Sequence, residues 1–97
     1  MSQIDYEALP EHIRAGVQRY VERGIIPGDF LQAVICNNLK ESFERADDIN
    51  QNRMFDIVKF FYNEVPGSCW GSKERMMKWN EKGGLLGPEV RKDEKEI

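Results

Sequence analysis

The chain has 97 residues, of which 40% are hydrophobic and 32% are charged, and its formal net charge is −3. This length suits one domain with a modest core, and the composition is ordinary for a globular protein. A net negative charge argues against sequence-independent binding to nucleic acid, which needs a basic surface.

Neither a membrane span nor a leader is expected. No apolar run approaches the roughly 20 residues that cross a bilayer. Residues 1–12 lack the positive start and apolar core of a signal peptide. We therefore expect a cytoplasmic protein without membrane contact, in which Cys36 and Cys69 are reduced thiols.

The first predicted helix covers residues 10–23 and follows a flexible arm at residues 1–9. Proline is favourable in a first helical turn, where Pro10 stands. Gly24 directly follows Arg23 and suits a C-terminal cap. The apolar face of this helix comprises Ile13, Val17, Tyr20 and Val21.

The second predicted helix, residues 30–46, is the one around which we expect the core to form. Pro27-Gly28 predicts a turn before it, and Asp29 suits its N-cap. Apolar residues recur at three- and four-residue steps and define one stripe. They are Leu31, Val34, Ile35, Leu39, Phe43 and Ala46.

Two further helices are predicted at residues 49–64 and 73–82. The third has a broad apolar surface, typical of a central helix touched on two sides. Its apolar residues are Met54, Phe55, Ile57, Val58, Phe61, Tyr62 and Val65. Four helices with short connections predict a small all-α bundle over residues 10–86. The charged segment 87–97 predicts a disordered tail.

Asn37 and Asn38 are candidate binding residues within the second predicted helix. Asparagine is unfavourable inside a helix because its side chain competes for backbone hydrogen bonds. Two interpretations stay open at this pair. Either Asn37 faces water and Asn38 bonds a loop carbonyl, or both amides serve a ligand or partner.

Asp47 and Asn50 belong to a polar cluster between the second and third predicted helices. Helix capping explains part of the cluster. Its spacing does not match a calcium loop, which has a central glycine and a late glutamate. A weak cation or a ribose contact is the functional alternative.

The loop at residues 66–72 offers a second candidate site. Ser72 predicts a helix start with Arg75 beside it, and such a start can hold a phosphate or carboxylate. Trp70 either stacks on a base or closes a small core. Tyr20 is a further candidate for contact with a base.

No catalytic or metal-binding pattern is found. His12 is the only histidine, and no Cys/His pair has the spacing of metal ligands. Nucleophile, base and orienting group cannot be assembled from separate elements. We therefore expect a protein that is not an enzyme and that needs no cofactor or metal.

A set of short motifs resembles a family of small proteins encoded by tailed phages and prophages. The matching positions are residues 9–12, 20–28, 30–31, 33–34, 38–39, 46–47, 50, 60–66, 69–72 and 79. The resemblance covers roughly residues 9–84, nearly the whole predicted bundle. The chain departs from the pattern at Asn37-Asn38-Leu39, where an Asn-Asp-Leu triplet is expected. The resemblance implies a phage gene and no particular reaction.

Three functions follow as hypotheses. The first is a phage protein in the host cytoplasm that binds a host factor, by analogy an inhibitor of antiviral defence. The second is an oligomeric sponge for a signalling nucleotide, with Tyr20, Trp70 and Ser72 around the ligand. The third, less favoured because of the net charge, is a nucleic-acid module using Lys73, Arg75 and Lys78. Homo-oligomerisation stays open in each.

Overall fold

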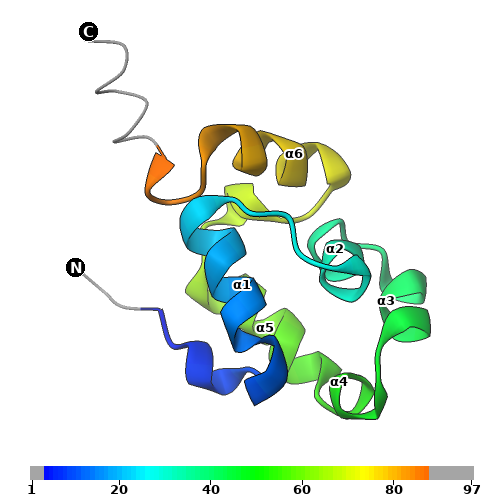
Figure 1. Cartoon of the computed structure of the whole chain (residues 1–97). Helices are drawn as coiled ribbons and strands as arrows, with labels where there is room; N and C mark the ends of the chain where they lie inside the picture. The colour runs from blue at the N-terminus through cyan, green and yellow to red at the C-terminus, as the bar shows by residue number, and fades with distance from the viewer. Residues whose placement is uncertain (1–3, 88–97) are drawn as a thin grey trace, which may run out of the picture.

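The computed structural model describes residues 4–87, and all regular structure in that range is helical (Figure 1). The α-helices are α1 (Glu11–Arg23), α2 (Asp29–Ile35), α3 (Leu39–Arg45), α4 (Asp48–Asn52), α5 (Met54–Glu64) and α6 (Lys73–Lys82). Two 3₁₀ turns, η1 (Tyr6–Ala8) and η2 (Gly67–Cys69), precede α1 and α6. The all-α prediction is confirmed, but the described chain has six α-helices where four were expected.

α1 matches the first predicted helix to within one residue. Pro10 stands at its N-cap, and Gly24 ends it in the left-handed conformation, with φ of 73°. The Gly24 N–H donates to the Tyr20 carbonyl at 2.8 Å. The four predicted apolar residues of this helix are all buried. The predicted apolar face and glycine cap of α1 are therefore confirmed.

The prediction of a single helix at residues 30–46 is wrong, because the chain bends at Cys36–Asn38 and forms α2 and α3. Asn37 has φ of 64°, and the N–H groups of Asn37 and Asn38 donate to the carbonyls of Val34 and Ala33. These two bonds form a Schellman end for α2. The Asn38 side chain then caps α3 by accepting from the Glu41 N–H at 3.2 Å. The asparagine pair ends one helix and begins the next.

This bend removes part of the expected core stripe. Leu31, Val34 and Ile35 on α2 are buried as predicted. Leu39 and Phe43 on α3 are instead 66% and 41% exposed. The change of direction after Ile35 turns their common face away from the core.

The third predicted helix is also divided, into α4 and α5 at Arg53. Asp47 caps α4 by accepting from the Asn50 N–H at 2.8 Å. Arg53 adopts φ of −105° and lies outside both helices. Its guanidinium bonds the Ala8 carbonyl at 2.9 Å and Asp56 at 2.7 Å. These contacts tie the α4–α5 junction to the segment before α1.

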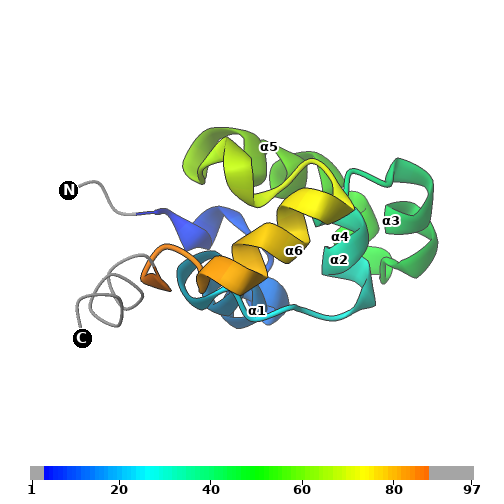
Figure 2. The same cartoon turned by 90° about the horizontal axis from the view of Figure 1, so that it is seen from above.

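α6 has the predicted limits. The Ser72 side chain accepts from the Arg75 N–H, and Gly83 ends the helix with φ of 89°. Figures 1 and 2 show α6 crossing the C-terminal end of α1. Trp79 makes the contact, since its indole N–H lies 3.0 Å from the Tyr20 carbonyl and 3.2 Å from that of Val21.

The core is one cluster to which residues from η1 to α6 contribute. Its largest fully buried side chains are Tyr20, Phe60 and Phe61. The rings of Phe60 and Phe61 meet edge to face, with centroids 5.5 Å apart. Each element is too short to bury much surface alone, so the fold depends on this shared cluster.

The ends of the chain are described only in part. Residues 1–3 of the expected arm and residues 88–97 of the expected tail lie outside the described range. Residues 4–9 pack onto the domain because Leu9 is fully buried and the Tyr6 ring lies 5.5 Å from that of Phe60. The described residues include no helix long and apolar enough to span a bilayer.

Candidate functional site

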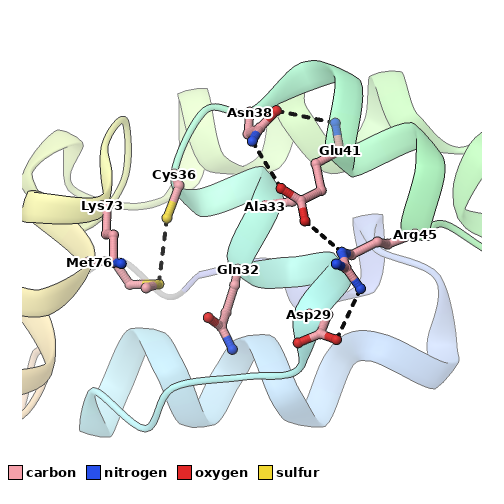
Figure 3. A pocket seen from close by; sticks show the side chains of 9 residues that line it. All are labelled: Asp29, Gln32, Ala33, Cys36, Asn38, Glu41, Arg45, Lys73 and Met76. Carbon is pink, nitrogen blue, oxygen red and sulfur yellow. Dashed lines mark hydrogen bonds and ion pairs between the residues drawn. The ribbon is translucent and has the colours of Figure 1, made fainter.

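A depression of about 350 Å³ lies beside the bend between α2 and α3 (Figure 3). We call it the hinge depression. Its lining residues are Asp29, Gln32, Ala33, Cys36, Asn38, Glu41, Arg45, Lys73 and Met76. They come from α2, from the bend, from α3 and from the start of α6, so the hollow lies where the bend meets α6.

The charged groups of the hinge depression largely bind one another. Arg45 lies between two carboxylates, with Nε 2.7 Å from Glu41 and Nη1 3.2 Å from Asp29. The Asn38 side-chain amide donates to the other Glu41 oxygen at 3.1 Å (Figure 3). This chain of contacts fixes α3 against the start of α2. It also leaves little uncompensated charge for a ligand, so we assign the network a structural role.

Cys36 contributes a thiol to the same depression. Its Sγ lies 3.9 Å from the Met76 sulfur, and burial raises the pKa of the Cys36 thiol. Burial also raises the pKa of Cys69 to about 12. The thiol form is a poor nucleophile and a poor metal ligand. Within residues 4–87, no three His, Cys, Asp or Glu side chains gather to hold a metal ion.

Asn37 and Asn38 remain accessible at the hinge, since both are exposed. Asn38 is already engaged with Glu41 through both its amide and its carbonyl oxygen. Asn37 holds the left-handed turn. Their presence in the sequence is thus explained by backbone geometry, and a binding role for either stays a prediction.

Asp47 and Asn50 lie together at the start of α4. Asp47 accepts from the Asn50 N–H and lies 3.0 Å from the His12 Nε2. The Asn50 side chain is 4% exposed, and its Oδ1 has no hydrogen-bond partner among the described residues. Because Asn50 is enclosed, it presents no surface to a partner of the folded protein.

Acid is expected to weaken the Asp47 cap. The Asn50 N–H and His12 lower the pKa of Asp47 below its ordinary value. A carboxylate with a lowered pKa in the folded state adds stability above its unfolded pKa, and this stability is lost as pH falls through the folded pKa. Asp47→Asn removes the titration but keeps an acceptor. We expect its stability difference from wild type to shrink as pH falls below about 4.

Urea unfolding at several pH values measures this difference. Asp48→Asn is the matched control, since Asp48 is the neighbouring residue and does not cap α4. A constant gap between Asp47→Asn and wild type from neutral to acid pH contradicts the expectation.

The remaining predicted site residues lie around η2 and α6. Tyr20 is fully buried, and its hydroxyl donates to the Cys69 carbonyl. Trp70 is half-buried, with its ring 5.6 Å from Phe61. Arg75 donates to the Gly67 and Trp70 carbonyls, and Ser72 caps α6. The structure gathers Trp70, Ser72 and Arg75 in one region but encloses Tyr20 beneath it.

One exposed surface was missed from the sequence, on the outer side of α5. Phe55 and Tyr62 are 75% and 78% exposed, and Lys59 lies between them along the helix. We call these three residues the aromatic ridge. Both aromatic residues belong to the apolar surface that predicts a central helix touched on two sides. α5 instead buries Met54, Ile57, Phe60 and Phe61 on its inner side only.

The ridge could be predicted from the positions of these residues around the helix axis. Residues seven positions apart stand almost in line on a helix, as Phe55 and Tyr62 do. The buried residues of α5 lie on the opposite side. An apolar surface wider than one stripe is therefore a sign of a second apolar face on the helix. On α5 this second face is exposed.

Comparison with protein-family models, with characterised proteins and with solved structures finds no match to this chain.

Proposed function

We propose that this chain is a small phage-encoded binding protein, without enzymatic activity, that acts on a protein of the host. The aromatic ridge of α5 is the proposed contact surface. The observation that carries the proposal is the exposure of Phe55 and Tyr62, at 75% and 78%. The phage origin and the host setting, with interference in antiviral defence as one outcome, rest on the sequence resemblance.

Two large aromatic side chains in line on one helix are suited to protein recognition. Seven residues at 1.5 Å each place them roughly 10 Å apart along the axis. Aromatic residues are enriched in the cores of protein interfaces and among the residues that dominate binding energy. Covering both rings removes apolar surface from water, and the favourable free energy is about 25 cal/mol per Å² of apolar surface buried.

Lys59 defines the chemistry of the partner. Its ammonium lies 5.9 Å from the centre of the Phe55 ring. Within residues 4–87 it has no carboxylate at ion-pair distance. A partner that covers the ridge therefore gains from a carboxylate placed among apolar side chains. We infer a partner surface that is apolar at its centre and acidic beside it.

A nucleotide sponge built on Tyr20, Trp70 and Ser72 receives less support. Tyr20 is fully buried and its hydroxyl is bonded to the Cys69 carbonyl. A base therefore has no access to this ring in the folded domain.

The double variant Phe55→Ser/Tyr62→Ser tests the proposal. The partner is captured from bacterial lysate with the tagged full chain, identified, and titrated against the purified protein. We expect the double variant to lose about 100-fold or more in affinity, because two interface aromatics are removed. Its unfolding free energy should change by less than about 1 kcal/mol, since both rings are exposed.

The matched control is Ile25→Ser/Met77→Ser, which removes two apolar side chains exposed at 48% and 44% outside α5. This control should bind as wild type does. Equal losses in both double variants overturn the assignment to α5. A homodimer in light scattering that the α5 variant dissociates also overturns it, because the ridge is then covered by a second copy.

A further inference from the structure

A second depression, of about 540 Å³, lies between α6 and the turn η2. We call it the basic depression. Its lining residues are Gly67, Ser68, Arg75, Lys78, Trp79 and Lys82. Positions 75, 78 and 82 are three and four residues apart and share one side of the helix. Three cationic side chains and no carboxylate therefore line this hollow.

Arg75 is held in place across the depression. Its Nη1 donates to the Gly67 carbonyl at 3.2 Å and to the Trp70 carbonyl at 3.3 Å. No bond from its Nε or Nη2 is found within residues 4–87. A guanidinium presents its donors as a planar fork that matches phosphate oxygens. The loop carbonyls thus orient a donor group whose remaining N–H bonds point to no internal acceptor.

Lys78 and Lys82 add two ammonium groups. Lys78 lies 3.7 Å from Glu74, and both side chains are more than 70% exposed. Such an exposed pair contributes little energy, so it competes weakly with a ligand. The Lys82 ammonium lies 4.4 Å from the centre of the Trp79 ring. The Trp79 side chain gives the hollow an apolar floor, which strengthens electrostatic attraction to an anion.

We infer that the basic depression binds a small ligand with two or more phosphate groups. Arg75 and Lys78 offer two separate cationic donor groups, which call for more than one negative charge, and the volume lies in the usual range for small-molecule sites. Trp79 is 2% exposed, so its ring cannot stack on a base. Recognition therefore goes through the phosphates. This site is separate from α5 and extends beyond the proposed protein-binding function.

Calorimetric titration of the full chain with pyrophosphate tests this inference, using orthophosphate, sulfate and a single-stranded oligonucleotide as parallel ligands. We expect pyrophosphate to bind most tightly and raised salt to weaken it. Lys78→Gln should lower the affinity about tenfold, the effect of losing one hydrogen bond to a charged group. Lys78→Arg should retain it.

The matched control is Lys73→Gln, on the same helix but lining the hinge depression. It should leave the pyrophosphate affinity within about twofold of wild type, because its charge lies outside the site. Circular dichroism verifies that each variant is folded. The inference is overturned if pyrophosphate gives no binding heat to the folded protein, or if Lys73→Gln and Lys78→Gln lose equally. Binding of the oligonucleotide alone also overturns it.

Discussion

Gly84→Ala should destabilise the domain by about 3 kcal/mol or more. Gly84 has φ of 76°, which a residue with a side chain rarely adopts. A Cβ at this position would stand 2.5 Å from the Glu22 carbonyl carbon and 2.6 Å from the Arg23 nitrogen. These are backbone atoms of α1, so the contact cannot be relieved by moving a side chain.

The segment after Gly84 would be displaced with it. The Leu85 N–H donates to the Val21 carbonyl, and the Leu86 N–H donates to the Glu22 carbonyl, both at 3.0 Å. These bonds satisfy carbonyl groups at the end of α1 that have no partner within the helix. A displaced backbone loses them together with the close packing of the two chains.

Thermal unfolding measures the Gly84→Ala effect. About 3 kcal/mol corresponds to a decrease of roughly 12–24 °C for a domain of this size. Gly67→Ala is the matched control, because a Cβ there meets no atom within 4 Å. It should change the unfolding free energy by less than about 0.5 kcal/mol. Similar melting temperatures for the two variants would show that the contact between α1 and residues 84–86 is not as described.

Trp79→Ala should cost about 3–5 kcal/mol, the usual range for removing a buried aromatic side chain. The ring is 2% exposed and lies between α6 and α1. Trp79→Phe separates the loss of apolar volume from the loss of the indole hydrogen bonds. It retains most of the apolar volume but removes the indole donor to the Tyr20 and Val21 carbonyls. Both carbonyls keep a backbone donor, the N–H of Gly24 and that of Leu85, so the lost hydrogen bonding costs about 0.5–1.5 kcal/mol.

Chemical denaturation of both variants tests the role of Trp79. Met77→Ala provides the control, since Met77 is on the same helix and 44% exposed. We expect the order of stability to be Met77→Ala, then Trp79→Phe, then Trp79→Ala. A loss below about 1 kcal/mol for Trp79→Ala would mean that α6 is not anchored through this side chain.

The helix ends marked by glycine were predictable from the sequence. Gly24 and Gly83 both stand where an apolar period stops, and both adopt the left-handed conformation. Only glycine enters that region at low cost, so its position carries direct information on the backbone. The position of Ser72 also carries information on the backbone. Its side chain accepts from the Arg75 N–H, which has no backbone acceptor at the start of the helix.

The break between α2 and α3 was not predicted, although the relevant residues were recognised. The apolar period from Leu31 to Phe43 is continuous and indicates one helix. It competes with two asparagines, which favour helix ends over helix interiors. The local preference of Asn37 and Asn38 prevails here. The apolar periodicity indicates which side of each short helix is buried. It does not show whether two consecutive helical segments form one straight helix.

The residues of the candidate site could be predicted from the sequence, but their accessibility could not. Tyr20 and Asn50 have side chains able to bind ligands, yet both are enclosed. Phe55 and Tyr62 have the composition of a core, yet both are exposed. Residue type does not determine which side of a helix meets the rest of the fold when apolar residues cover both sides. That assignment needs the tertiary arrangement.

We propose that the aromatic ridge of α5 contacts a host protein. Site-specific photo-crosslinking tests it most directly, with a photoreactive amino acid placed at position 62 or, as a control, at position 18 on the exposed side of α1. We predict one crosslinked host protein from position 62 and none from position 18. Excess wild-type protein should abolish the crosslink, and excess Phe55→Ser/Tyr62→Ser should not. Equal crosslinking from both positions, or equal competition by both proteins, would contradict the claim.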